Sequence, residues 1–132
     1  MHLKKTSSYG ILATVYIATH EKEGPVQGWA IAEECGIPPE YLHKVLLQLV
    51  RGRILISKRG RGGGFTLLTT PGQVTLLDII QAIEGPLDPG LIIRGKINIP
   101  PRAKKRFEGV RAEIYQYAAS KFGKVTVKQL MD

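Results

Sequence analysis

Two short apolar runs flank the heptapeptide Arg59-Gly60-Arg61-Gly62-Gly63-Gly64-Phe65. Three consecutive glycines are unfavourable in a packed element, because glycine loses more backbone entropy on folding than any other residue. The flanking runs, residues 54–58 and 65–68, are rich in β-forming side chains, so the stretch predicts a hairpin with the glycines at its tip. Two guanidinium groups on a loop with few other side chains suit close approach to phosphates. The alternative is a plain hairpin turn, which needs only one or two glycines.

The residues before this hairpin predict two short helices joined by a tight turn. A helix over residues 28–35 ends where Gly36 suits the C′ position. A second helix over residues 39–51 begins at Pro39, which the first helical turn tolerates. The apolar stripe of the second helix comprises Leu42, Val45, Leu46 and Leu49. Helix, turn, helix and hairpin is the order of a winged helix-turn-helix.

Further helices are predicted on both sides of this unit. Residues 7–20 carry apolar side chains at helical spacing, at Tyr9, Leu12, Ala13, Tyr16 and Ile17. Thr75 begins another helix, with Asp78 completing an approximate capping box, and Gly85-Pro86 ends it. Trp29 is expected to pack between helices. A last capping signature joins Thr126 to Gln129.

The longest predicted helix, residues 101–122, carries a narrow apolar seam of the kind that two helices share. The seam is formed by Phe107, Val110, Ile114 and Tyr117. We therefore expect a mainly α fold with a small β wing in three parts. These are a winged helix-turn-helix DNA-binding domain over residues 1–86, a crossing loop over 87–100, and a dimerisation helix with a C-terminal turn over 101–132.

The distribution of charge favours a polyanionic partner. The formal net charge of the 132 residues is +8. Residues 41–77 contain no Asp or Glu but six Lys and Arg, and residues 94–132 carry a further net charge of +7. Neutralising phosphates with such cations releases condensed counterions whatever the base sequence. An anionic membrane surface would also attract the chain, and a merely basic, solvated surface is the remaining interpretation.

Several classes of protein are disfavoured. The glycine loop fails the last position of G-x-G-x-x-G, no G-K-[ST] follows it, and no catalytic triad or carboxylate pair can be proposed, so we do not expect an enzyme. One cysteine and three scattered histidines give no metal-ligand spacing. We expect neither metal nor cofactor. No apolar run approaches the length of about 20 residues that spans a bilayer, and the start lacks a signal-peptide core, which favours a cytoplasmic protein.

The ordered motifs of the chain resemble those of the Rrf2 family of bacterial transcription regulators. The matching stretches are Ser8-Tyr9, Ile31-Ala32-Glu33, Gly36-Ile37-Pro38-Pro39-Glu40-Tyr41-Leu42, Arg59 to Phe65, and Thr75-Leu76-Leu77-Asp78-Ile79-Ile80-Gln81-Ala82-Ile83-Glu84-Gly85-Pro86. The resemblance is close over residues 1–86 and looser over the dimer helix. It implies a winged-helix homodimer that binds a palindromic operator on double-stranded DNA and usually represses transcription.

The resemblance also implies a sensor, and here the chain departs from the family pattern. Many members hold an iron–sulfur cluster with three cysteines located between the Glu-Gly-Pro helix end and the dimer helix. The corresponding residues 87–101 contain no cysteine. We therefore expect cluster-independent regulation, by a small-molecule effector, by a protein effector, or by no signal at all. Cys35 lies in the helix-turn-helix and is expected to be a small packing residue, with a redox switch as the alternative role.

The DNA contacts are expected to come from the second helix and the wing. Side chains in the first half of the recognition helix reach base edges in the major groove, while the wing follows the backbone or minor groove. Arg51 and Lys58 are expected to hold phosphates. The whole predicted set is Tyr41, His43, Lys44, Gln48, Arg51, Lys58, Arg59, Arg61, Gly62 and Gly63. For each side chain, an ordinary solvated position is the alternative.

Two other functions stay open at this point. Arg61-Gly62-Gly63 resembles one copy of an RGG element, which would suit an RNA-binding module, although no aromatic stacking sheet accompanies it. A sensor whose main partner is another protein, using the same winged helix, is the second.

Overall fold

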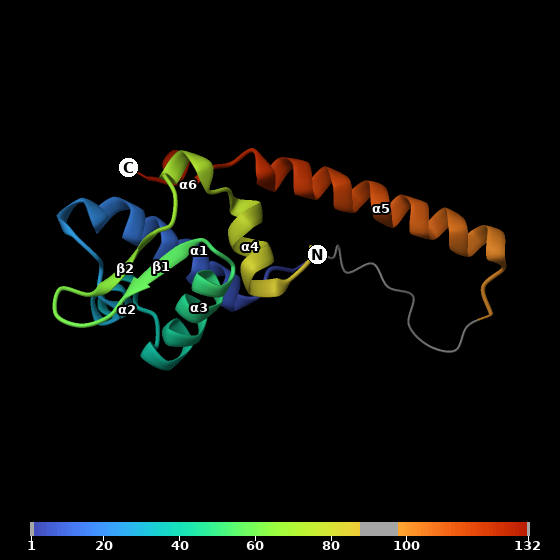
Figure 1. Ribbon diagram of the computed structural model, residues 1–132. Coiled ribbons are helices and arrows are strands. Elements are labelled where there is room, and N and C mark those ends of the chain that lie inside the picture. Colours follow the sequence, from blue (N-terminus) through green and yellow to red (C-terminus); the bar gives the residue numbers. More distant parts are fainter. Residues whose placement is uncertain (1, 88–97, 132) are drawn as a thin grey trace.

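The computed structural model describes residues 2–87 and 98–131, and Figure 1 shows their arrangement. The elements are α1 (Lys5–His20), η1 (Glu21–Glu23), α2 (Gly28–Cys35), α3 (Pro39–Arg51), β1 (Leu55–Lys58), β2 (Gly64–Leu67), η2 (Pro71–Gln73), α4 (Leu76–Glu84), α5 (Pro101–Gly123) and α6 (Val127–Leu130). The expected fold, mainly α with a two-stranded wing and a long C-terminal helix, is confirmed.

The turn between α2 and α3 has the geometry that its residues predict. Gly36 adopts a left-handed conformation with φ of 66°, and the Ile37 amide donates to the Ala32 carbonyl at 3.0 Å. Pro39 occupies the first turn of α3, where its missing N–H leaves no hydrogen bond unmade. The two helices of the predicted helix-turn-helix have the predicted bounds.

The wing is held both by the pairing of its two strands and by a third segment that contacts β2 near the glycine loop. β1 and β2 pair antiparallel, with Leu55 opposite Leu67 and Lys58 opposite Gly64. Val26, which lies between α1 and α2, forms an isolated bridge with Phe65 through two hydrogen bonds of 2.9 and 2.8 Å. The segment between α1 and α2 therefore fixes the hairpin against the rest of the domain.

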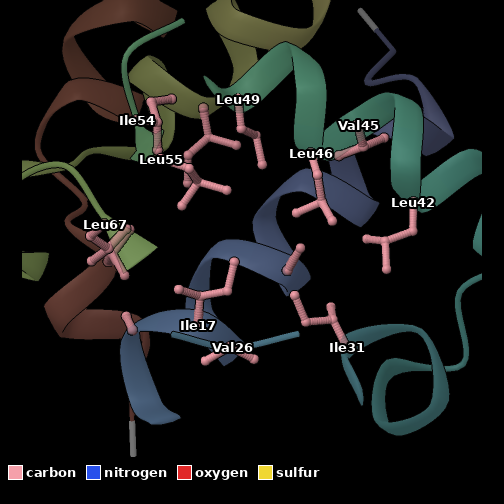
Figure 2. Close-up of a cluster of buried hydrophobic side chains, with 14 of the residues drawn as sticks. Ile17, Val26, Ile31, Leu42, Val45, Leu46, Leu49, Ile54, Leu55 and Leu67 are labelled. Carbon is pink, nitrogen blue, oxygen red and sulfur yellow. The ribbon is translucent and has the colours of Figure 1, made fainter. Parts of the chain in front are cut away.

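The core lies where α1, α2, α3 and the base of the wing meet (Figure 2). The expected stripe of α3 is confirmed, since Leu42, Val45, Leu46 and Leu49 are all at most 2% exposed. Ile17 from α1 and Ile31 from α2 are fully buried against it. This packing fixes which face of α3 remains outside.

The buried face of α1 includes the predicted Ala13 and Ile17 but not Leu12, and it extends to small residues that the apolar pattern does not indicate. Leu12 is 49% exposed, whereas Ser7 and Thr14 are fully buried and Gly10 is buried too. A Cβ on Gly10 would lie 3.2 Å from Ile83, so the small residue lets α4 approach α1 closely. Ser7 Oγ donates a hydrogen bond to Glu84, which satisfies the buried hydroxyl. Close helix packing, rather than hydrophobicity alone, selects this face.

Replacing Gly10 with Leu is expected to lower the free energy of unfolding by about 1–3 kcal/mol, because the side chain would overpack the α1–α4 contact. Gly109→Leu is the matched control, since a Cβ on Gly109 in α5 meets no atom within 4 Å. That change is expected to stabilise the helix by about 0.5–1 kcal/mol. Chemical denaturation of both variants measures the difference, and equal effects would contradict the close packing of α1 on α4.

The N-terminal ends of α4 and α6 are capped as the sequence predicts. The Thr75 amide donates to Asp78 Oδ2 at 2.9 Å and the Asp78 amide donates to Thr75 Oγ1 at 3.1 Å. Thr126 and Gln129 form the same reciprocal pair at the start of α6. A bridge between Thr75 and Thr126, with Val127 fully buried, ties the C-terminal end of α5 to the domain.

The helix α5 extends away from the remaining elements (Figure 1). None of its 23 residues is buried. Of the predicted crossing loop over residues 87–100, positions 88–97 lie outside the described residues. The long helix therefore meets the domain at its C-terminal end and leaves most of its surface exposed.

Candidate nucleic-acid interface

The outer face of α3 presents the side chains that the sequence predicts for the major groove. Tyr41, His43 and Lys44 are exposed, and Tyr41 is 52% exposed. Within residues 2–87 and 98–131, none of the three side chains makes a hydrogen bond or ion pair with another residue. The first half of α3 thus offers an aromatic ring with a hydroxyl, an imidazole and an ammonium group to an external partner.

Gln48 lies at the edge of this face and is engaged inside the protein. It is partly buried, and its Nε2 donates to the Ile83 carbonyl of α4 at 3.4 Å. Its Oε1 is buried without a hydrogen-bond partner in the described part of the chain. The contact with α4 turns the amide away from the centre of the exposed face, where Lys44 and Arg51 lie.

The wing carries its cations outward. Lys58 at the end of β1 and Arg59 and Arg61 in the loop are all exposed. No ion pair with another described residue neutralises them. Arg51 is exposed at the last turn of α3. Two elements adjacent in sequence, α3 and the hairpin, thus both expose cations that have no ion-pair partner among the described residues.

The wing's own backbone explains its glycines. Gly62 has φ of 73°, a conformation that side chains disfavour. A Cβ on Gly63 would lie 2.3 Å from the Lys58 carbonyl oxygen, so no side chain fits there. A Cβ on Gly64 would lie 2.6 Å from the Val26 carbonyl oxygen. The expectation that a plain turn needs only one or two glycines is therefore wrong for this hairpin, and the glycine run is no independent sign of phosphate contact.

Trp29 is a candidate that sequence reasoning missed. The structure corrects its expected place between helices: the side chain is 67% exposed on α2, and its Nε1 donates to Gln27 Oε1. Helical phase could have shown this, because position 29 lies roughly 160° around the helix from the buried Ile31. An exposed indole beside α3 adds aromatic surface to the interface.

Comparison with models of known protein families identifies the family of the chain. The family model of Rrf2, described as an iron-dependent transcriptional regulator, matches residues 3–132. The chain belongs to the Rrf2 family. Membership makes this Rrf2 protein a helix-turn-helix transcriptional regulator and not an enzyme, as the sequence motifs predict.

Individual Rrf2 relatives agree with this assignment. The chain is 31% identical over 131 residues to the HTH-type regulator BadM of Rhodopseudomonas palustris, covering 99% of this chain and 81% of BadM. It is 38% identical over 89 residues to the regulator slr0846 of Synechocystis sp., covering 67% of this chain and 60% of that protein. The match thus spans less than two thirds of that relative's length.

Solved Rrf2 structures share the fold. CymR of B. subtilis, the global cysteine regulator, superposes with a TM-score of 0.74 at 23% identity, covering 98% of this chain and 95% of CymR. IscR of T. potens superposes with a TM-score of 0.71 at 27% identity, covering 98% of this chain and 85% of IscR.

The residues of this Rrf2 chain do not fit an iron centre. The sequence holds a single cysteine, and no group of three or more His, Cys, Asp or Glu that could bind a metal occurs in the described ranges 2–87 and 98–131. Cys35 is partly buried and packs against the core. Burial, with the Glu34 carboxylate adding to it, raises the pKa of the Cys35 thiol, which lowers its thiolate fraction.

No helix within residues 2–87 and 98–131 of this Rrf2 chain combines the length and the apolar character that a bilayer span requires.

Proposed function

We propose that this Rrf2 protein is a sequence-specific repressor that binds a palindromic operator as a homodimer, without an iron–sulfur cluster. The observation that supports it most directly is that the cations of α3 and the wing are exposed and have no ion-pair partner among the described residues; they are Lys44, Arg51, Lys58, Arg59 and Arg61. Tyr41, His43 and Lys44 would enter the major groove, the width of which admits an α-helix. Gln48 would contribute least, because α4 already engages it.

The wing and the end of α3 would hold the DNA backbone. Arg51 lies at the end of α3 and Lys58 at the end of β1, and Arg59 and Arg61 are exposed in the loop that follows. Gly62 is exposed and would let the loop lie close to the sugar–phosphate chain, whereas Gly63 is buried against the Lys58 carbonyl and would support the turn from inside. Contacts of this kind position a protein on DNA without specifying the sequence, so specificity would come from α3.

The homodimer is supported by the unpartnered seam of α5. Val110 and Ile114 are 38% and 37% exposed and Tyr117 is 67% exposed, with Phe107 completing the stripe. Large apolar side chains at this spacing suit a second helix of the same kind. In the proposed division of the chain, residues 1–86 bind DNA, 87–100 cross to the long helix, and 101–132 join the two copies.

Selection of genomic fragments by the purified protein tests the proposal. Enrichment of a two-fold symmetric motif, with half-sites about one helical turn or a multiple apart, is the expected result. Enrichment without any shared motif would instead favour an architectural or RNA-binding role. Binding to a partner protein with no retained DNA would favour a sensor module.

A further inference from the structure

A cavity of about 510 Å³ lies between α2, the start of α3 and β2. Its floor is apolar and consists of Ala32, Ile37, Leu42, Leu46 and Phe65. Figure 2 shows Leu42 and Leu46 directed from α3 into the buried cluster that also contains Ile31 of α2. Small-molecule sites typically enclose about 300–1,000 Å³ with a mostly apolar lining and a few polar groups, so the size and the lining suit a ligand.

The rim of this cavity carries polar and aromatic groups of a particular kind. Trp29, Glu33 and His43 line it and are exposed. Within the described residues, neither the Glu33 carboxylate nor the His43 imidazole has a hydrogen-bond or ion-pair partner. No Lys or Arg of the described chain lines the cavity, although the net charge is +8.

This lining discriminates between kinds of occupant. The Glu33 carboxylate would repel a phosphate or a carboxylate ligand and attract a cation. The Trp29 indole and the Phe65 ring offer faces to a planar apolar group, and aromatic faces also favour cations. The complementary ligand is a small molecule with an aromatic body and one positively charged nitrogen.

We propose that this cavity binds a small aromatic amine, with its ring on the apolar floor and its ammonium group beside Glu33, and that the bound amine competes with DNA. The competition follows from shared residues and rests on the function proposed above. His43 lines the cavity and also belongs to the face of α3 proposed to enter the major groove. Pro39 at the start of α3 lines the cavity as well, so a bound ligand would lie against the N-terminal half of α3.

Direct binding is tested with two probes of similar shape and opposite charge, 4-phenylbutylamine and 4-phenylbutyrate. Trp29 is the single tryptophan of the chain, so its fluorescence reports occupancy of the cavity without a label. The amine is expected to change this signal saturably and to bind at least about fivefold more tightly than the acid, since the charge of Glu33 favours one and opposes the other. No saturable change, or equal affinity for both probes, overturns the proposal.

Glu33→Gln and Glu34→Gln form the matched pair of variants. Both residues are exposed on α2, but Glu34 does not line the cavity. Glu33→Gln is expected to abolish the preference for the amine, while Glu34→Gln retains it. Loss of the preference in both variants would mean that the general field of α2, rather than a site at Glu33, attracts the amine, and would overturn the assignment. Both variants keep Trp29, so one readout serves throughout.

The competition is tested with DNA fragments enriched by the selection experiment. Saturating amine is expected to lower the affinity of the wild-type protein for DNA at least about fivefold, and bound DNA is expected to weaken amine binding by the same factor, as linkage requires. Amine binding with unchanged DNA affinity overturns the competition. A protein that binds the amine but no DNA even without it contradicts the proposed DNA-binding function and leaves the cavity assignment standing.

Discussion

Ile114→Asp is expected to convert the protein into a monomer and to lower its affinity for a two-fold symmetric operator by about 100-fold or more. The side chain lies in the middle of the exposed seam of α5, 37% exposed in the single chain. A carboxylate there would be buried without a partner if two seams packed together, which is strongly unfavourable. When one winged domain of a dimer is bound, the second is held close to the other half-site, so the dimer binds the whole operator more tightly than a monomer does.

Ala112→Asp is the control for this change. Ala112 is also exposed on α5, but it lies roughly 160° around the helix from Ile114. The substitution introduces the same charge into the same helix but outside the seam, so this variant is expected to remain dimeric. Light scattering and operator titration of both variants measure the two effects. A dimeric Ile114→Asp protein would show that copies of the chain associate elsewhere.

The double change Arg59→Ala and Arg61→Ala is expected to weaken DNA binding roughly 100-fold at moderate salt, about tenfold for each charge-assisted hydrogen bond to phosphate that is removed. The weakening should be similar on all DNA sequences, because such bonds to phosphates carry no sequence information. The slope of log affinity against log salt should fall by about 1 for each arginine removed. Neither guanidinium has a partner among the described residues, so the fold should tolerate the change.

His43→Ala supplies the contrast. The imidazole is exposed on the first half of α3, and its removal is expected to relax the preference at one base-pair position by about 1–3 kcal/mol while changing the salt slope little. Affinity measured on operator variants at several salt concentrations separates the two kinds of effect. Equal loss of sequence preference from the arginine and histidine changes would contradict this division between wing and helix.

Local signals made most of the fold predictable from the sequence. The bounds of α2 and α3 follow from Gly36 and Pro39, and the capping box of α4 follows from Thr75 and Asp78. Such signals depend on only a few neighbouring residues, so they can be recognised in the sequence without knowledge of tertiary contacts. The helix α5 was predictable in the same way, because its apolar spacing repeats along one helix.

Features that depend on contacts distant in sequence were not predictable. The predicted face of α1 is right for Ala13 and Ile17 but wrong for Leu12, and it omits Ser7 and Gly10, which α4 covers from some seventy residues later in the chain. The wing's glycine run was interpreted through an external partner, yet its requirement comes from the Val26 bridge and the loop's own carbonyls.

The candidate site also has features that the sequence predicts and features that depend on distant contacts. Exposure of His43, Lys44 and the wing arginines follows from helical phase and hairpin position, and the structure places them on the surface as expected. The engagement of Gln48 with the Ile83 carbonyl could not be inferred, because it requires the approach of α4.

The anchorage of α5 at its C-terminal end has a mechanical consequence. The bridge between Thr75 and Thr126, together with buried Val127, couples that end of the long helix to the start of α4 and so to the body that carries α3. In a dimer joined through the seam, the two α5 helices would cross each other, and each winged domain would be attached to the end of its helix at a distance from that crossing. A small rotation at that crossing would be magnified into a change in the separation of the two recognition helices, which a fixed operator spacing tolerates poorly.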